Sequence, residues 1–276
     1  MLIYDSIIIG AGPAGIVAAI QLKRSGRDIL IFEKDKVGGL LRNANLVENY
    51  VGVGDGMIGK DLVEVFEKKL KEQEINVLAE EVIDIKKDEV FEIKTNQNVY
   101  KSKTVIVATG TIPKKLDIAG VGDLEKEEKI FYEVKDIFDQ KNIKKVIVIG
   151  GGDAGFDYSI NLNNRGFEPE IVTRGDFSCL PLLLKRAKES GISMHKNQKI
   201  KEIKKHDEEI KVVTNKKSFN ADAILVAIGR EPSIPIEIEE QEGLYIVGDA
   251  KGGKHRQVHI ATGDALNAAM DIVALY

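Results

Sequence analysis

The chain has 276 residues, of which 43% are hydrophobic and 30% charged; this balance is typical of globular proteins, and the length fits two domains. A net charge of −4 and the lack of a basic cluster with interleaved aromatic residues argue against a nucleic-acid-binding protein. A single cysteine, Cys179, excludes an internal disulfide and a CxxC redox pair, and four scattered histidines show no metal-ligand spacing.

The N-terminus and the hydropathy pattern predict a cytoplasmic protein. No apolar run reaches the ~18–20 residues that a membrane span needs. Residues 1–6 have neither a basic region nor a cleavage site and lead directly into a strand, so we expect no signal peptide.

A strand, a glycine-rich turn and a helix follow one another twice along the chain. In the first copy, the strand 6–9 leads to the turn 10–15 and the helix 16–25, and the strand 28–32 comes next. The second copy has the same order, with the strand 145–149, the turn 150–155, the helix 156–164 and the strand 170–173. This distant internal repeat of a βαβ unit predicts an α/β protein with two Rossmann-like three-layer dinucleotide-binding domains.

The rest of the chain supplies elements that complete each domain. The charged stretch 123–129 is expected to be a solvated loop. We expect helices over residues 59–73, 182–190 and 261–275, antiparallel strands over 77–86 and 90–95, a hairpin from 200–203 and 210–213, and buried strands over 104–108, 223–227 and 244–247.

The first turn carries a GxGxxG pattern in the context that binds a dinucleotide. Gly10 permits the tight turn, Gly12 lets the backbone approach a pyrophosphate, and Gly15 lets the helix pack closely on the sheet. The helix N-terminus adds free N–H groups and a positive dipole end. Glu33 follows the second strand, about 20 residues after the loop, where a carboxylate accepts hydrogen bonds from a ribose diol.

The second GxGxxG turn differs at the position of the ribose-binding acid. Thr173 and Arg174 stand there, and a cation at this place suits the 2′-phosphate of NADP. A solvated surface arginine is the alternative interpretation of Arg174, so the identity of the nucleotide stays open.

Further segments, taken together with both glycine motifs, resemble the low-molecular-weight thioredoxin reductase family over nearly the whole chain. The sequences GGLL at 38–41 and VENYVG at 47–52 are similar to the segments that cradle the flavin in that family. Gly248-Asp249 matches its second FAD motif, and Arg256-Gln257 matches the RQ segment that opens the last helix. The resemblance implies a bound FAD, NADP or NAD as the second cofactor, and a homodimer.

The same resemblance implies which residues contact the cofactors. The FAD contacts would be Gly10, Gly12, Pro13, Ala14, Gly15, Glu33, Lys34, Gly39, Leu40, Asn49, Val82, Ala108, Thr109, Gly110, Gly248, Asp249, Gln257 and Val258. The nicotinamide contacts would be Gly150, Gly152, Asp153, Ala154, Thr173, Arg174 and Gly229.

The chain departs from this family where the redox-active cysteines belong. Residues 130–136, IFYEVKD, stand in place of the CxxC region, and without two thiols electrons cannot pass to an internal disulfide. This segment, with GGGD at 150–153, is similar to the ferredoxin–NADP reductases built on the thioredoxin reductase fold, which lack the pair. That similarity implies a redox protein such as ferredoxin or flavodoxin as partner. The family's paired arginines are reduced to Arg174.

Several side chains near these motifs have two interpretations. Cys179 has no neighbouring base or cation, which favours a structural cysteine over a reactive one. His259, in the first turn of the last helix, is either a proton relay near the flavin or a solvated or capping histidine. Tyr50 and Tyr132 either stack near the flavin or pack in the core, and Lys135 either balances charge at the flavin or lies on the surface.

The sequence therefore predicts an FAD-dependent oxidoreductase that moves electrons between NAD(P)H and an external acceptor. Residues 1–113 and 236–276 are expected to form the FAD domain, and residues 114–235 the NAD(P) domain, with crossovers near Pro113 and Pro232–Pro235. One alternative is a ferredoxin-driven flavin reductase that no longer uses a nicotinamide. The other is a flavin-bound regulatory or binding module.

Overall fold

The computed structural model describes residues 2–206, 209–234 and 241–275. The chain divides into two compact units. The first unit comprises Met1–Arg42, Val47–Ile112 and Glu231–Tyr276, and the second comprises Asn43–Leu46 and Pro113–Arg230. Two of the four crossings fall within the short strands β7 (Thr111–Pro113) and β16 (Arg230–Pro232), and the other two flank Asn43–Leu46. The predicted boundary between residues 235 and 236 lies outside the described residues.

The first unit is built on a mixed seven-stranded sheet in the order β3-β2-β1-β6-β5-β4, with β17 also paired to β6. The strands β1, β2, β3, β6 and β17 run parallel, whereas β4 and β5 are antiparallel. The long β6 changes neighbours along its length, because its first half pairs with β5 and its second half with β17. The strand bounds are β1 Ile3–Ile9, β2 Ile29–Phe32, β3 Val77–Leu78, β4 Val82–Lys87, β5 Phe91–Thr95, β6 Val99–Val107 and β17 Leu244–Ile246.

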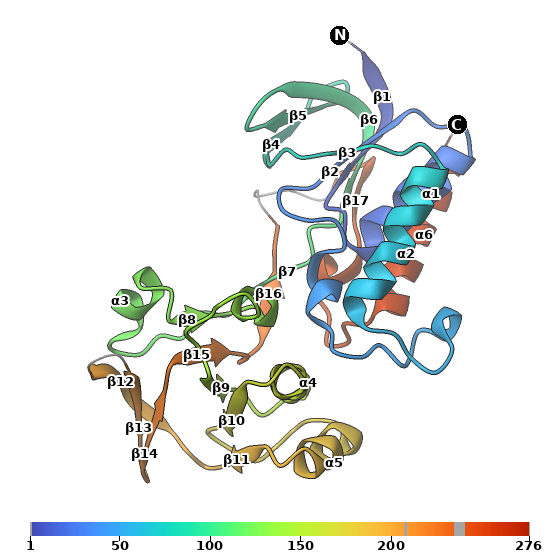
Figure 1. Ribbon diagram of the computed structural model, residues 1–276. Helices are drawn as coiled ribbons and strands as arrows, with labels where there is room; N and C mark the ends of the chain where they lie inside the picture. The colour runs from blue at the N-terminus through green and yellow to red at the C-terminus, as the bar shows by residue number, and fades with distance from the viewer. Residues whose placement is uncertain (1, 207–208, 235–240, 276) are drawn as a thin grey trace. The chain divides into compact units, whose positions relative to one another are not determined.

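Helices α1 (Pro13–Arg24), α2 (Gly59–Glu72) and α6 (Val258–Ala274) lie together on one face of this sheet (Figure 1). Alternate residues of each strand point to opposite faces. Accordingly Ile7 and Ile9 of β1 pack in an apolar cluster with side chains of β4 and β5. Helix α1 begins four residues after the end of β1, so its N-terminus lies at the carboxyl ends of the parallel strands. Dinucleotides bind at this edge in such folds.

The second unit contains a parallel five-stranded sheet in the order β11-β10-β9-β15-β8 and an antiparallel sheet, β12-β13-β14. The first sheet comprises β8 Ile130–Phe131, β9 Lys145–Ile149, β10 Glu168–Val172, β11 Ser193–His195 and β15 Ala223–Val226; the second comprises β12 Ile200–His206, β13 Glu209–Thr214 and β14 Ser218–Ala221. The helical elements are α3 Val121–Lys126, α4 Asp153–Asn164, α5 Pro181–Glu189 and the 3-10 turn η3 Val134–Ile137.

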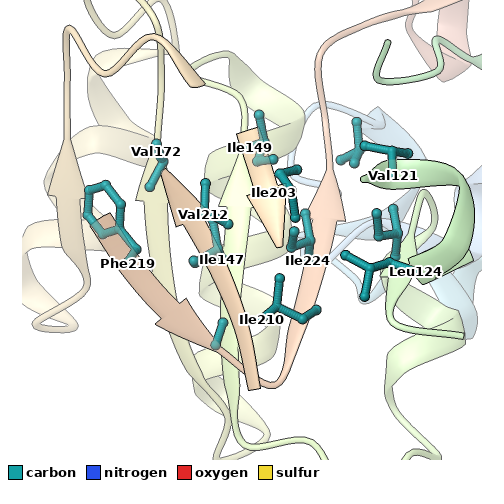
Figure 2. Close-up of a cluster of buried hydrophobic side chains, with 13 residues drawn as sticks. Val121, Leu124, Ile147, Ile149, Val172, Ile203, Ile210, Val212, Phe219 and Ile224 are labelled. Atoms are coloured by element: carbon teal, nitrogen blue, oxygen red, sulfur yellow. The ribbon is translucent and has the colours of Figure 1, made fainter. Parts of the chain in front are cut away.

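The two sheets of the second unit enclose an apolar core. Ile203, Ile210 and Val212 of the antiparallel sheet face Ile147 and Ile224 of the parallel sheet (Figure 2). On the opposite face, α4 and η3 cover the parallel sheet through a separate cluster. Among the described residues, none of the helices is long and apolar enough to cross a membrane.

Two expected elements are wrong in detail. The segment 77–86 is not one antiparallel strand, because β3 pairs parallel with β2 and β4 begins only at Val82. Between them Glu80 is buried and accepts a hydrogen bond from Thr95 Oγ1, which anchors the break. The charged stretch 123–129 is not wholly a loop, because its first four residues belong to α3. Val121 and Leu124 lie on one face of that helix and are buried in the core (Figure 2).

Candidate functional site

The first glycine loop needs glycine at two positions for packing reasons. Gly10 has φ +100°, and a Cβ there would lie 2.5 Å from the Ala108 carbonyl oxygen. A Cβ on Gly15 would lie 1.9 Å from the Gly10 carbonyl oxygen, so any side chain would push α1 off the loop. The loop therefore holds α1 close against β1 and β6.

The middle glycine of this loop faces open space. Gly12 precedes α1, whose first residue is Pro13, and a Cβ on Gly12 would meet no described atom within 4 Å. On a second segment, a Cβ built on Gly39 would come within 3.6 Å of the Gly12 Cα, and Gly38 N donates to the Ala11 carbonyl oxygen at 2.7 Å. The space beside Gly12, at a helix N-terminus, fits a pyrophosphate.

Glu33 follows β2, and its carboxylate reaches back to the glycine loop. Oε2 accepts a hydrogen bond from Ala11 N at 2.9 Å, and Oε1 accepts one from Asp35 N at 3.0 Å. This places the carboxylate beside the loop, as ribose recognition requires. The Lys34 side chain turns to the surface, where Nζ lies 3.1 Å from Glu81 Oε1.

The C-terminal part of the chain joins the same region of the first unit. Gly248 has φ +62°, and a Cβ there would lie 3.2 Å from the Cβ atoms of both Ala14 and Ala261. The 3-10 turn η4 (Gly248–Lys251), which carries Asp249, is thus fitted between α1 and α6. Segments more than 200 residues apart in sequence meet at the N-terminus of α1.

Other predicted FAD contacts lie at the strand ends or in the core. Ala108 N donates to the Ile9 carbonyl oxygen at 2.8 Å, Thr109 Oγ1 donates to the Ser233 carbonyl oxygen, and the Gly110 carbonyl oxygen accepts from Ser233 N at 2.9 Å. These bonds hold the turn that follows β6. Val82 instead is buried in the apolar cluster under β4 and β5.

The start of α6 and the segment before η2 (Val51–Val53) are bonded through their side chains. Gln257 directly precedes α6, whose first residue is Val258, and Asn49 Nδ2 donates to Gln257 Oε1 at 2.7 Å. Leu40 lies in the 3-10 turn η1 (Gly39–Asn43), which directly follows Gly38. The structure thus brings Asn49 and Gln257 together, although no sequence pattern pairs them.

The second glycine loop repeats the same packing in the second unit. Gly150 has φ +148°, and a Cβ there would lie 2.2 Å from the Ala227 carbonyl oxygen. A Cβ on Gly155 would lie 2.5 Å from the Gly150 carbonyl oxygen. Gly152 precedes α4, whose first residues Asp153 and Ala154 are exposed.

A neighbouring segment borders the second loop, as the segment 38–39 borders the first. Ser178 N donates to the Gly151 carbonyl oxygen at 2.8 Å, and Leu180 N donates to Asp153 Oδ1 at 2.7 Å. The segment 178–180 therefore borders the loop, and the nearest atom to a Cβ built on Gly152 is Ser178 Oγ at 3.7 Å. Burial raises the pKa of the Cys179 thiol in this segment, which disfavours a reactive thiolate.

The residues after β10 differ in exposure. Thr173 is buried and packs on the loop, since a Cβ on Gly151 would lie 2.8 Å from Thr173 Oγ1. Arg174 is exposed. Gly229, with φ +114°, follows β15, and its carbonyl oxygen accepts from Lys114 N at 3.0 Å.

The segment that replaces the cysteine region forms a polar network in the second unit. Glu133 Oε1 lies 2.7 Å from Arg230 Nη1, and Asn43 Nδ2 donates to Glu133 Oε2 at 2.7 Å. Asn45 N donates to Asp157 Oδ2 at 3.0 Å, and burial raises the pKa of Asp157 to about 6. Sequence reasoning missed this network, because its members are far apart along the chain and follow no motif.

Tyr132 packs within the second unit. Its hydroxyl donates to Glu125 Oε1 at 2.6 Å, and Lys115 Nζ lies 3.8 Å from its ring centroid. Burial, followed by the bond to Glu125, raises the pKa of Tyr132 to about 12. These contacts agree with the packing interpretation of this tyrosine.

Comparison with known proteins identifies the family to which this chain belongs. Residues 4–265 match the family model described as pyridine nucleotide-disulphide oxidoreductase. The chain belongs to this family. It is 32% identical to a thioredoxin reductase of Bacillus subtilis (strain 168), over 98% of this chain and 94% of that one. It is 28% identical to the "34.2 kDa protein in rubredoxin operon" of Clostridium pasteurianum, over 96% and 95%.

Solved structures agree with this assignment. The thioredoxin reductase of T. acidophilum superimposes with a TM-score of 0.89 at 26% identity, covering 98% of each chain. The bacillithiol disulfide reductase Bdr from Staphylococcus aureus, at 22% identity and a TM-score of 0.80, shares the fold over 100% of this chain and 99% of that one. The chain is an FAD/NAD(P) oxidoreductase of the thioredoxin reductase family, and its single cysteine leaves it without a CxxC pair.

The family typically binds FAD and NAD(P)H, and the residues of the first unit fit FAD. The open space beside Gly12, the Glu33 carboxylate and the turns at Gly39 and Gly248 surround one helix N-terminus. Any Cβ at Gly12 would enter the space that a pyrophosphate needs.

Proposed function

We propose that this chain transfers electrons between NAD(P)H and an external redox protein, such as a ferredoxin or a flavodoxin, without an internal disulfide. The observation that carries the proposal is the combination of two intact glycine loops with one cysteine. Both loops keep the close packing that a dinucleotide fold needs, which is expected if both sites remain in use. The thiol pair that would carry electrons onward is missing, so they leave by another route.

The residues of the first unit bind and orient the flavin. When bound, FAD supplies both hydride and one-electron chemistry. The N–H groups at the start of α1 would donate hydrogen bonds to its pyrophosphate, and the Glu33 carboxylate would accept hydrogen bonds from its ribose. The N-terminus of α6, which follows Gln257, carries the positive end of a helix dipole, which would stabilise negative charge on the flavin.

The second unit would hold the nicotinamide nucleotide at the start of α4. Arg174 is exposed directly after β10, at the position where a cation recognises the 2′-phosphate of NADP. This supports NADPH over NADH as the electron donor or product.

The nature of the acceptor is inferred from the missing thiols. A flavin exchanges single electrons, so a small one-electron carrier is a suitable partner. The relative from Clostridium pasteurianum is named for its place in a rubredoxin operon, which is in keeping with a redox-protein partner.

A second function is favoured by the segment 178–180. Ser178 Oγ would lie 3.7 Å from a Cβ built on Gly152, whereas a Cβ on Gly12 would meet no described atom within 4 Å, so this site has slightly less room than the loop in the first unit. A chain that had abandoned the nicotinamide would be a ferredoxin-driven flavin reductase.

An anaerobic titration separates these functions. NADPH or NADH, added to the flavin-loaded protein without oxygen, should bleach the absorbance of oxidised flavin, with NADPH effective at the lower concentration. If neither nucleotide bleaches the flavin, the proposed function is wrong. Bleaching by reduced ferredoxin alone would then select the nicotinamide-free reductase.

A further inference from the structure

His259, in the first turn of α6, contacts the segment that precedes and begins η2. Its ring stacks on the Tyr50 ring, with centroids 4.7 Å apart and planes 26° apart. On its other edge the Tyr50 ring meets Phe66 of α2, at 6.0 Å and 83°. The three rings connect α2, η2 and α6 within the first unit.

The same imidazole accepts a backbone hydrogen bond. Val51 N donates to His259 Nε2 at 3.2 Å. A backbone N–H can only donate, so Nε2 carries no proton, and the proton of the neutral ring lies on Nδ1. Nε2 is therefore occupied as an acceptor and does not relay protons in this arrangement.

A second hydrogen bond joins the same two segments, two residues earlier in each. Asn49 Nδ2 donates to Gln257 Oε1 at 2.7 Å, so residues 49 and 51 bond to residues 257 and 259. At the base of the segment, Val47 and Met57 exchange two backbone bonds of 2.7 and 3.0 Å. The segment from Val47 to Val51 is thus held both at its base and along the start of α6.

We propose that His259 is a positioning residue for the flavin, which holds Asn49–Val51 against the N-terminus of α6. This inference rests on FAD binding in the first unit. The bond to His259 would thereby hold the side-chain amides of Asn49 and Gln257 in the positions from which they contact the flavin at the N-terminus of α6. The stack on Tyr50 fixes the plane of the imidazole ring, and the hydrogen bond from Val51 N fixes the direction in which Nε2 points.

The structure supplies a substitution that removes the donor alone. Val51→Pro deletes the N–H, and Tyr50, with φ −97° and ψ 103°, has the extended backbone that a residue before proline prefers. Val51 is the first residue of η2, where proline is accommodated, and the residue is 89% exposed. His259→Phe removes the acceptor and keeps an aromatic ring for the stack.

A double-mutant cycle on FAD affinity tests the inference, using Val51→Pro, His259→Phe and both together. Each single change should weaken FAD binding about threefold, because one exposed hydrogen bond is lost. The double variant should bind FAD with the same affinity as the weaker-binding single variant, since both changes remove the same hydrogen bond. Val51→Ala retains the N–H and should bind FAD more tightly than Val51→Pro. Ile260→Phe, at the adjacent exposed position, is the matched control for His259→Phe.

A spectroscopic measurement separates positioning from a loss of stability. His259→Phe and Val51→Pro should shift the absorbance maxima of the bound flavin in the same direction, with the melting temperature of the flavin-free protein unchanged. Additive losses of affinity, unaltered affinity in both variants, or a lowered melting temperature with an unaltered spectrum would each overturn the inference. Failure of the wild-type protein to bind FAD would instead overturn the proposed function.

Discussion

Arg230 and Glu133 form an ion pair with a separation of 2.7 Å, and each side chain is only about one-sixth exposed, at 17% and 16%. The second carboxylate oxygen of Glu133 accepts from Asn43 Nδ2. Glu133 lies in the segment that replaces the cysteine region of thioredoxin reductases. With both oxygens bonded, this residue is placed as a structural anchor of the second unit.

Replacing that anchor should destabilise the second unit. Glu133→Gln leaves a neutral amide opposite a mostly buried guanidinium, and we expect a loss of about 1–3 kcal/mol in the free energy of unfolding. Urea denaturation followed by far-UV circular dichroism measures it. Glu231→Gln, an exposed residue next to Arg230, is the control and should change little. Equal stability of both variants would contradict the anchoring role.

Gly12→Val should separate FAD binding from folding. The position has no described atom within 4 Å of a built Cβ and a φ of −75°, so the side chain fits the protein. It fills the space beside the helix N-terminus, and FAD affinity should fall by about 100-fold or more. Fluorescence titration with FAD measures the affinity, with Gly122→Val, an equally open glycine, as control. Tight FAD binding by Gly12→Val would place the pyrophosphate elsewhere.

Arg174→Gln should change nucleotide preference rather than nucleotide binding in general. The exposed guanidinium is proposed to contact the 2′-phosphate, which NADH lacks. The dissociation constant for NADPH should therefore rise about tenfold while that for NADH stays constant. Isothermal calorimetry with both nucleotides measures this, and Lys216→Gln, an exposed cation in a turn, is the matched control. A parallel loss for both nucleotides would contradict the assignment.

Asp157 makes the stability of the second unit depend on pH. Burial raises its pKa from 3.8 to about 6, so ionisation is less favourable in the folded protein than in the unfolded chain. Its contribution to stability is present below pH ~4 and is lost as the pH rises through about 6, by at most about 3 kcal/mol. Asp157→Asn cannot ionise, and its side-chain oxygen can still accept from Asn45 N. The free energy of unfolding of Asp157→Asn should therefore exceed that of the wild type by an increasing margin between pH ~4 and ~7. A margin that does not vary with pH would refute this.

Cys179→Ser should leave electron transfer intact. The thiol is half-buried, burial raises its pKa, and no second cysteine exists to form a disulfide with it. Reduction of ferricyanide by NADPH should proceed within about twofold of the wild-type rate, since the reaction needs no thiol. A severe loss of this activity, with FAD still bound, would show that the thiol takes part in the reaction.

The two glycine loops could be predicted from the sequence because their requirements are local. Gly10 and Gly150 follow a strand and precede a helix, and their backbone conformations allow no side chain. Strand and helix periodicities are likewise local, which is why β1, α1, β9 and α4 lie where the sequence predicts them. Short elements are less predictable: the start of α3 falls in a charged stretch, and the helix packs Val121 and Leu124 in the core with side chains of β12 and β13.

By itself the sequence determined the repeated βαβ unit, the glycine turns and the absence of a second thiol, because these depend on residues close together in the chain or on composition. Only the tertiary structure decided that His259 accepts from Val51, that Asn49 meets Gln257, and that Glu133 is held by Arg230. Each of these pairs spans about 100 to 200 residues. Such contacts arise when strands order themselves in a sheet, and no local pattern records which partner a polar side chain will find there.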